Sequence, residues 1–386
     1  MKKLAIVLLS VTLMFGLLLN FADTKVIQTN AIGEEFTAKS ALLIDYDSGQ
    51  ILFEKNSKNH LPIASMVKLM TILLTLEAID NGQLELTQEV VASKNASGMG
   101  GSQVFIDANS EYTVEELLKS AIVASANDAA VALAETISGS ENEFVQLMNT
   151  RASQLKMDDT NYVNATGLPA PNNYSCALDV STVTREVLKH DIYYDYSGIW
   201  MDSLTHKSGR VTELVNTNRL IKYYQGCDGG KTGSTSEAKY CVSATAEKNN
   251  LRLISVILGA DSGAIRFSEA ASLFDYGFAN FESKAVFTKG EEIVDLEIDS
   301  ANIKSFKPIV AKDCRILSKK NEKKEIVVKF EFDKTKAPMK VNEKIGTAYV
   351  IRNGIVVDEV DVLAPYDINK STIFDSIKVI TKHWTI

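Results

Sequence analysis

Two stretches with the pattern of β-hairpins, far apart in the chain, limit the folds that this sequence can adopt. The first, SALLIDYDSGQILFEKN at residues 40–56, has two short apolar runs around the turn residues 47–50. The second joins the β-rich runs 240–246 and 251–258 through the turn residues 247–250. Because helical patterns fill the interval, we expect an α/β unit whose sheet is built from both of its ends.

Several helical patterns lie between the two hairpins. Apolar residues recur at helical spacing over residues 65–80. Thr113 and Glu116 have the spacing of a capping box, which predicts the start of another helix. That pattern breaks at residues 125–127 and resumes over 128–137. The sequence therefore predicts a helical layer with one interruption.

The length of the chain and a change in its pattern predict a second, smaller unit. A chain of 386 residues can bury one substantial core and a smaller one. From about residue 286, short runs of alternating polarity replace the helical patterns, which predicts a small C-terminal all-β domain. The expected divisions are a signal peptide at 1–31, an α/β domain at 32–284, a β-rich domain at 285–366 and an amphipathic helix at 367–386.

The N-terminus has the form of a secretory signal peptide. Met-Lys-Lys is followed by an uncharged run from Leu4 to Leu19. We expect export, with cleavage near Ala31 favoured over cleavage near Ala22. The alternative is a retained membrane anchor, although 16 uncharged residues are short for a bilayer.

Composition excludes several classes of function. The 41 basic and 49 acidic residues give a net charge of −8, so we expect no nucleic-acid partner. The cysteines show no C-x-x-C pair and the histidines lie in no recognisable catalytic setting, so we expect free buried thiols, no metal site and no cofactor. The four cysteines are Cys176, Cys227, Cys241 and Cys314.

A serine and a lysine three positions apart form the first candidate for chemistry. Ser65 and Lys68 lie in the stretch IASMVKLM. A serine hydroxyl needs an adjacent base, and lysine can serve if burial or another cation lowers its pKa. Positions i and i+3 share one face of a helix. Because S-x-x-K is common by chance, the alternative is an ordinary helix start with a solvated lysine.

Two further motifs complete the candidate site. Ser125-Ala126-Asn127 lies where the helical pattern breaks, which exposes a hydroxyl and a carboxamide, although both residues are also ordinary helix caps. Gly230-Lys231-Thr232-Gly233-Ser234 is expected to open a strand. Its small residues would let a substrate backbone approach the strand edge, and Lys231 would supply a fixed positive charge.

In this order, S-x-x-K, S-x-N and K-T-G resemble the motifs of penicillin-binding proteins and class A β-lactamases. In particular, the chain resembles the low-molecular-weight penicillin-binding proteins that are serine-type D-alanyl-D-alanine carboxypeptidases, and is similar to the Bacillus sporulation-type carboxypeptidases. The resemblance covers residues 36 to about 280 and extends to the β domain and the tail. Ala126 stands where the family usually has glycine. The further matching stretches are 99–103 (MGGSQ), 161–168 (NYVNATGL), 216–220 (NTNRL) and 228–233 (DGGKTG).

The resemblance implies a fold and a reaction. The fold would be the penicillin-binding/β-lactamase-like transpeptidase fold, an antiparallel sheet flanked by helices, with the small C-terminal all-β domain. Ser65 would attack the carbonyl between the two terminal D-alanines of a peptidoglycan stem peptide, and Lys68 would take its proton. Ser125 would relay that proton to the departing D-alanine, and Asn127 would hydrogen-bond the substrate or orient Lys68.

The resemblance also implies how the substrate is held. Lys231 would keep Lys68 neutral by charge repulsion and attract the substrate carboxylate. The backbone N–H groups of Ser65 and Ser234 would form the oxyanion hole. Arg266 would lie near the carboxylate or, alternatively, in a surface salt bridge. β-lactam antibiotics would acylate the nucleophile. The residues expected to bind substrate are Lys231, Thr232, Gly233, Ser234 and Arg266.

Other functions stay open or are disfavoured. A DD-transpeptidase or endopeptidase would differ only in what resolves the acyl-enzyme. A β-lactamase is disfavoured because no glutamate occurs between Phe144 and Arg185 to position a deacylating water. A zinc carboxypeptidase would need a cluster of ligands. A non-catalytic cell-wall binding protein would have lost one of the motif residues, and all are present.

The last residues form an amphipathic pattern. Within 369–386 an apolar stripe lies opposite two lysines. The pattern alone allows either a helix packed on the β domain or a helix lying on an anionic membrane surface. The resemblance implies the second, with the enzyme held peripherally at the extracytoplasmic face of the membrane. The stripe is formed by Ile373, Ile377, Ile380 and Trp384, and the lysines are Lys378 and Lys382.

Overall fold

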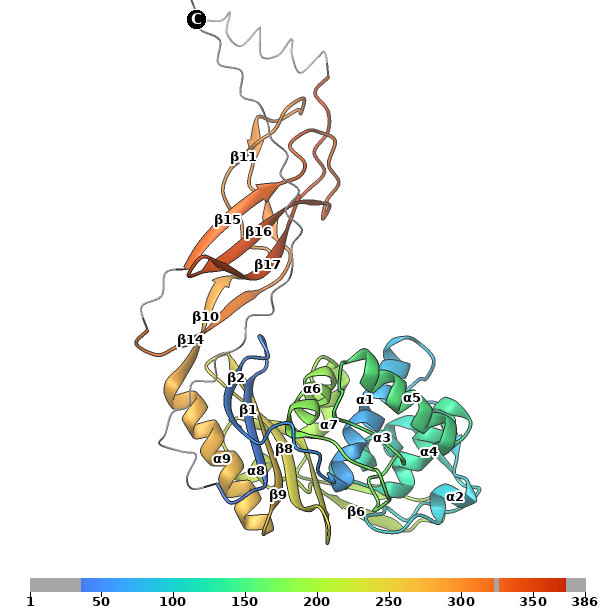
Figure 1. Cartoon of the computed structure of the whole chain (residues 1–386). Coiled ribbons are helices and arrows are strands. Elements are labelled where there is room, and N and C mark those ends of the chain that lie inside the picture. The colour runs from blue at the N-terminus through green and yellow to red at the C-terminus, as the bar shows by residue number, and fades with distance from the viewer. Residues whose placement is uncertain (1–35, 323–325, 373–386) are drawn as a thin grey trace, which may run out of the picture.

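The structure is a computed structural model that describes residues 36–322 and 326–372. The predicted signal peptide at 1–31 and the apolar stripe from Ile373 onward lie outside the described residues. An α/β unit and a β domain follow one another along the chain (Figure 1). The predicted order of the two units is therefore the order observed.

The α/β unit is organised around one five-stranded antiparallel sheet. Its strand order, β2-β1-β9-β8-β7, places the N-terminal hairpin beside the C-terminal strands. The sheet is therefore built from both ends of the unit, as the two hairpin patterns predicted. Its strands are β1 (Ser40–Asp45), β2 (Ile51–Lys55), β7 (Cys227–Thr235), β8 (Lys239–Lys248) and β9 (Leu251–Ala260).

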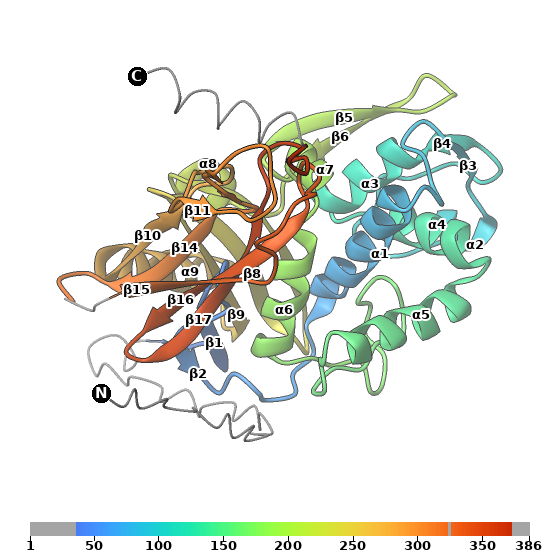
Figure 2. The same cartoon turned by 90° about the horizontal axis from the view of Figure 1, so that it is seen from above.

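Helices cover both faces of this sheet (Figures 1 and 2). On one face α9 (Gly263–Asn280) packs Leu273 and Phe274 against sheet residues that include Leu43. On the other face α6 (Ala177–Val187) belongs to the larger core, which the sheet shares with the helical layer. Strands buried on both faces are continuously apolar, which explains why β1 and β9 lack strict alternation.

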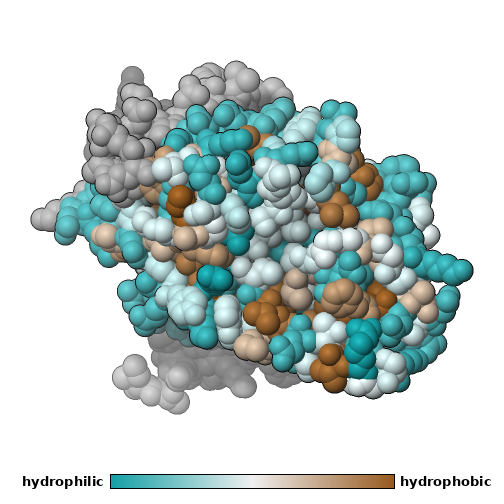
Figure 3. All heavy atoms as spheres, turned by 90° about the horizontal axis from the view of Figure 1, so that it is seen from below, coloured by the Kyte–Doolittle hydropathy of each residue, from teal (hydrophilic) through white to brown (hydrophobic). Residues whose placement is uncertain are grey.

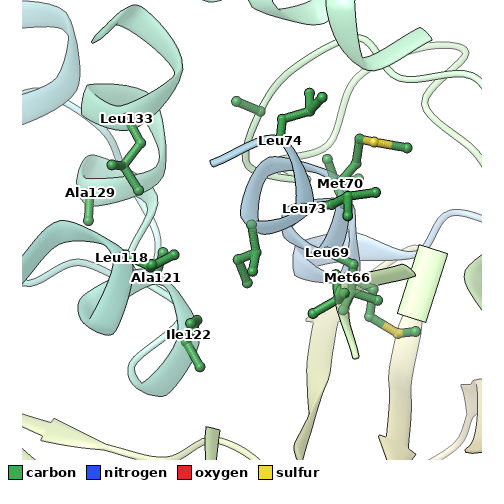
Figure 4. Close-up of a cluster of buried hydrophobic side chains, with 14 of the residues drawn as sticks. Met66, Leu69, Met70, Leu73, Leu74, Leu118, Ala121, Ile122, Ala129 and Leu133 are labelled. Atoms are coloured by element: carbon green, nitrogen blue, oxygen red, sulfur yellow. The ribbon is translucent and has the colours of Figure 1, made fainter. Parts of the chain in front are cut away.

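The helical layer packs against α1, the helix that follows Ser65. In Figure 4, Leu69 and Leu73 of α1 lie on one side of the buried cluster, and Leu118 of α3 and Leu133 of α4 lie on the other. All four of these leucines are buried. The helices are α1 (Lys68–Asp80), α2 (Lys94–Ser97), α3 (Val114–Val123), α4 (Asn127–Ser138), α5 (Glu141–Gln154), α7 (Asp191–Ser197) and α8 (Leu220–Tyr223).

Local sequence signals account for the helix boundaries. Thr113 and Glu116 form the predicted capping box at the start of α3. α4 ends at Gly139, which adopts the left-handed conformation typical of helix C-termini. The predicted helix start at Ser65 is wrong, because residues 64–67 form a 3₁₀ turn, η1 (Ala64–Val67), and the α-helix begins at Lys68.

Two small two-stranded sheets extend the unit. β3 (Glu89–Val91) pairs with β4 (Glu111–Thr113), and β5 (Met201–Thr205) pairs with β6 (Val211–Val215). The β5–β6 hairpin carries exposed Met201, Val211 and Val215. Figure 3, the view from below, shows apolar and polar residues mixed on this end of the molecule. Single exposed apolar residues are common on protein surfaces, so they indicate no function by themselves.

The β domain follows α9 without a linker. β10 (Phe281–Phe287) starts at the end of α9 and pairs with β14 (Cys314–Lys319). A four-stranded sheet of order β13-β17-β16-β15 and the short pair β11–β12 form the rest. The predicted all-β domain is therefore confirmed. The remaining strands are β11 (Leu296–Glu297), β12 (Ser305–Phe306), β13 (Ile309–Val310), β15 (Ile326–Phe332), β16 (Lys344–Arg352) and β17 (Ile355–Leu363).

The β domain extends past the predicted boundary at residue 366. Ile368 is 1% exposed, and its backbone exchanges hydrogen bonds with Met339. Ala301 pairs with Lys370, and Ser371 N–H donates to Ser300 O. Any separate C-terminal helix therefore begins later than predicted.

One prediction from composition can be compared with the described residues. All four cysteines are free and buried, as expected. In the described parts of the chain, no helix is long and apolar enough to cross a membrane.

Candidate active site

Ser65 and Lys68 come together at the start of α1. Lys68 Nζ lies 3.0 Å from Ser65 Oγ. In a 3₁₀ turn, residues i and i+3 lie directly above one another, so η1 aligns the two side chains more closely than an α-helix would. Ala64, just before Ser65, has a positive φ of 48°. A non-glycine residue in this region is strained, as is common at functional sites.

The Lys68 amine is buried without a carboxylate partner among the described residues. Its side chain is 0% exposed, and its second hydrogen bond, 2.7 Å long, goes to Thr166 O. Burial lowers the pKa of Lys68 well below its ordinary value, and the positive charge of Lys231 lowers it further, whereas Asp128 opposes the shift. Both of the causes named from the sequence, burial and a second cation, act on Lys68, and burial is the larger.

The stretch 161–168 forms a turn that supports both side chains. Asn164 Oδ1 accepts hydrogen bonds from the backbone N–H groups of Thr166 and Gly167. Gly167 has a φ of 81°, and a Cβ at this position would lie 1.9 Å from Ala64 O. Only glycine therefore allows this turn to pack directly against the residue that precedes Ser65.

Ser125 lies on the turn between α3 and α4, and Asn127 is the first residue of α4. Ser125 has a positive φ of 59°, is 3% exposed and has no hydrogen-bond partner for its Oγ among the described residues. Asn127 Nδ2 donates to Gly100 O at 2.6 Å, while its Oδ1 is buried and unpaired. Ala126 has a φ of −63°, so alanine causes no strain where the family usually has glycine. The turn thus presents a hydroxyl and a carbonyl oxygen without partners.

The K-T-G stretch lies within β7, the edge strand of the sheet. The strand begins at Cys227, so the expectation that these residues open it is wrong. A Cβ on Gly233 would lie 3.0 Å from Ser65 N, so β7 passes directly beside η1. Lys231 and Gly233 share one face of the strand, because side chains alternate in direction. Lys231 therefore lies on the side of β7 that faces Ser65.

Lys231 is a second buried lysine without a carboxylate partner among the described residues. It is 1% exposed, and its Nζ donates to Thr232 O at 3.2 Å. Burial lowers the pKa of Lys231 to about 7, with the charge of Arg266 as the second cause. A buried cation of this kind is well suited to binding an anionic ligand.

Arg266 lies against the same strand. Its Nη1 donates to Gly233 O at 3.1 Å and to Cys241 O at 3.2 Å, and its guanidinium lies over the ring of Phe267. Arg266 makes no ion pair with the described residues, and its Nε is buried without a partner. The alternative of a surface salt bridge is therefore wrong for the described part of the chain.

A further contact joins β7 to the segment around Thr217, to which the sequence analysis assigned no role. Thr232 Oγ1 donates to Thr217 Oγ1 at 2.7 Å. Thr217 N–H donates to Val123 O, two residues before Ser125. Thr217, Thr166 and Gly167 all lie in stretches that carried the family resemblance, but no single-residue signal marked them.

The arrangement is suited to acyl transfer through a serine. It joins a hydroxyl, a buried amine that favours the neutral form, a second hydroxyl without a partner and two cations. The described residues contain no cluster of ligands that could hold a metal ion. Ser234 lies next to Gly233 on the strand beside η1. The predicted site residues therefore come from four segments: η1 with the start of α1, residues 125–127, β7, and α9, which carries Arg266.

Comparisons with known proteins agree with this chemistry. Residues 25–262 match the family described as D-alanyl-D-alanine carboxypeptidase, and residues 281–370 match the C-terminal domain of penicillin-binding protein 5. The chain is 38% identical to the D-alanyl-D-alanine carboxypeptidase DacF of Bacillus subtilis over 98% of both chains.

Solved structures with the same architecture include two penicillin-binding proteins. Penicillin-binding protein 5 from Haemophilus influenzae matches with a TM-score of 0.69 and 30% identity, covering 87% of this chain and 98% of that one. Penicillin-binding protein 3 from Streptococcus pneumoniae, described as a peptidoglycan synthesis regulatory factor, matches with a TM-score of 0.74 and 26% identity, covering 86% and 100%. The predicted fold class is therefore confirmed.

Proposed function

Because the chain belongs to the D-alanyl-D-alanine carboxypeptidase family, whose members are serine-type hydrolases, we propose that Ser65 is its nucleophile and Lys68 its general base. The reaction is removal of the terminal D-alanine from peptidoglycan stem peptides. The observation that carries the assignment is the 3.0 Å contact between Ser65 Oγ and the buried amine of Lys68. A neutral amine at that distance accepts the hydroxyl proton as the oxygen attacks.

The attack produces an oxyanion that needs hydrogen-bond donors. We assign this role to the backbone N–H groups of Ser65 and Ser234, because η1 and β7 lie side by side at Gly233. Donors fixed by a turn and a strand need no reorganisation when the charge develops. The peptide carbonyl between the two terminal D-alanines would lie between them.

The departing D-alanine must receive a proton. Ser125 supports this role because its hydroxyl is buried and has no partner among the described residues, in a turn held under backbone strain. The proton that Lys68 accepts passes through Ser125 to the amine of the leaving group. Asn127 presents its unpaired Oδ1 beside this path and hydrogen-bonds the substrate.

The carboxylate of the leaving D-alanine binds beside the two cations of the site, Lys231 and Arg266. Lys231 and Arg266 support this role because neither is paired with a carboxylate among the described residues. Thr232, Gly233 and Ser234 supply the strand edge along which the peptide lies. A carboxylate between two such cations forms charge-assisted hydrogen bonds, which are stronger than neutral ones.

Water then hydrolyses the ester on Ser65 and releases the shortened peptide. A β-lactam reacts by the same attack, because its amide takes the place of the D-Ala-D-Ala bond. Between Phe144 and Arg185 the sequence has no glutamate to position a hydrolytic water in the manner of a class A β-lactamase. The penicilloyl ester on Ser65 is therefore expected to be long-lived.

We further propose that the enzyme works outside the cytoplasm and is held on a membrane surface by residues 373–386. Figure 1 shows the described chain ending at the end of the β domain away from the α/β unit. Lys304, Lys336 and Lys370 are exposed there and make no ion pair with described residues. These three lysines can contact anionic headgroups, and the β domain would separate the bilayer from the active site.

Product analysis tests the reaction. A pentapeptide ending in D-Ala-D-Ala should lose one alanine, as measured by mass spectrometry. Adding a D-amino acid as acceptor should not divert the product, and a chelator should not reduce the rate. A product lengthened by the acceptor would assign transpeptidation instead, and loss of activity with the chelator would assign metal-dependent hydrolysis.

The pH dependence of acylation tests the base. Because the pKa of Lys68 is lowered, the neutral amine should accumulate, and acylation should rise, well below pH 10.5. Acylation should fall again as Lys231, with a pKa of about 7 before substrate binds, loses its charge. The rise and the fall of the acylation rate with pH both report the coupled titration of Lys68 and Lys231, and neither belongs to one lysine alone.

The variant Lys68→Arg should lose acylation by on the order of 10²- to 10⁴-fold, because arginine stays protonated. Lys189→Arg, an exposed lysine paired with Glu186, is the matched control and should keep the wild-type rate. A Lys68→Arg variant that acylates at nearly the wild-type rate would exclude Lys68 as the base.

Truncation tests the membrane anchor. A chain that ends at Thr372 keeps the buried Ile368, so it should stay folded and react with penicillin. It should no longer sediment with anionic vesicles, whereas the longer chain should. Vesicles of neutral lipid serve as the control for charge. Equal sedimentation of the two chains would place the attachment elsewhere.

A further inference from the structure

Asp128 is a buried carboxylate beside the candidate active site. It follows Asn127 in the first turn of α4, and its side chain is 0% exposed. A carboxylate taken out of water is stable only where hydrogen bonds or a cation satisfy its oxygens. The partners of Asp128 therefore show what this residue holds in place.

Backbone N–H groups of the segment 100–106 satisfy the carboxylate. Val104 N lies 3.1 Å from Asp128 Oδ2 and 3.2 Å from Oδ1, and Ile106 N–H donates to Oδ2 at 3.1 Å. Ala129 N–H donates to Oδ1 at 2.9 Å. Both oxygens of Asp128 thus act as acceptors, and two of the three donors belong to the 100–106 segment.

The same segment packs against Asn127. Asn127 Nδ2 donates to Gly100 O at 2.6 Å, and Asn127 N–H donates to Ser102 O at 2.7 Å. A Cβ on Gly101 would lie 2.8 Å from Asn127 Nδ2, so the segment passes directly against this side chain. The start of α4 therefore holds the 100–106 segment at both ends, through Asn127 and through Asp128.

The bonds to Asp128 fix a strained stretch of backbone. Phe105 lies between the two donors, has a positive φ of 60° and is 59% exposed. A bulky residue rarely adopts this conformation unless the surrounding structure imposes it. Val104 and Ile106 are buried on either side, and Arg210 donates to Phe105 O at 2.5 Å. Asp128 thus holds the segment from the interior, and the exposed Arg210 holds it from the surface.

The hydrogen bonds at this position require a carboxylate. An ionised aspartate offers two acceptor oxygens and no hydrogen, whereas asparagine replaces one oxygen with an NH₂ group that can only donate. Because both oxygens of Asp128 accept backbone N–H groups, the NH₂ group would face a donor in either orientation. Asparagine at position 128 would therefore release part of the 100–106 segment.

The negative charge of Asp128 also acts on the proposed base. It raises the pKa of Lys68, against the lowering by burial, which is the largest cause, and by Lys231. Loss of this charge would lower the pKa of Lys68 further, so the neutral amine would form at lower pH. A role of Asp128 in folding alone would leave this pH dependence unchanged.

We propose that Asp128 is a positioning residue for the reaction, which fixes the 100–106 segment and through it the carboxamide of Asn127. The inference rests on the proposed function, in which Asn127 hydrogen-bonds the substrate. It assigns a role to a residue outside the three motifs. Because Asp128 is fully buried, it acts through its neighbours and not by touching the substrate.

The test measures acylation by benzylpenicillin across a range of pH, in the full-length chain and in its variant Asp128→Asn. At the optimal pH the variant should be slower by on the order of 10- to 100-fold, which is the effect of losing a hydrogen bond to a charged group. The rise of the rate with pH should move to lower pH. Hydrogen–deuterium exchange should become faster in residues 100–106 and stay unchanged in α1.

Two further variants separate the effects of position and charge. Arg210→Ala removes the hydrogen bond to Phe105 O and loosens the same segment, without removing a charge that acts on Lys68. It should slow acylation less than Asp128→Asn does and leave the pH of the rise unchanged. Glu135→Gln, at the other end of α4, is the matched control. It keeps an acceptor for Asn95 Nδ2 and should change neither the rate nor its pH dependence.

The outcomes distinguish this inference from the proposed function. Wild-type acylation by Asp128→Asn, or faster exchange throughout the α/β unit with no shift in pH, would overturn the positioning role. If Asp128→Asn does not fold, Arg210→Ala decides: faster exchange in residues 100–106 with slower acylation supports the role, and faster exchange with wild-type acylation overturns it. If the wild type neither releases D-alanine nor reacts with penicillin, the proposed function fails instead.

Discussion

The burial of the Lys68 amine beside Ser65 is the interaction on which the rest of the site depends. An ammonium buried without a paired charge is unstable, so the group favours its neutral form. Lys68 is 0% exposed, and the charge of Lys231 acts in the same direction as its burial. In the proposed mechanism, this lysine takes the place of the histidine that other serine hydrolases use as a base.

The fold keeps this amine buried from several directions. α1 is packed along its length among α3 and α4, so it cannot move away from the sheet (Figure 4). The turn around Asn164 closes over Lys68 through Thr166 O and fits only because Gly167 lacks a side chain. β7 closes the third side at Gly233. The central sheet, built from both ends of the α/β unit, fixes that strand.

Periodicity and capping signals predicted most of the fold, and the candidate site residues came from the three motifs and the resemblance that they carry. The hairpin patterns and the Thr113–Glu116 capping box correspond to observed elements because each depends on local sequence. The 3₁₀ turn at Ser65 was not predicted, because packing against β7 and Gly167 shapes it. The contacts of Thr217 and Thr166 O were not predicted, because they join segments that are distant in the sequence. The late end of the β domain depends on the pairing of Ile368 with Met339.

Mapping the residue to which penicillin attaches is the most direct test of Ser65 as the nucleophile. The account predicts that a fluorescent penicillin labels the protein covalently, that peptide mass analysis places the adduct on Ser65, and that Ser65→Ala is not labelled. Because Ser65 is half-buried on η1, its replacement by alanine should leave the fold intact. An adduct on another residue, or undiminished labelling of Ser65→Ala, would contradict the claim that the buried lysine activates this serine.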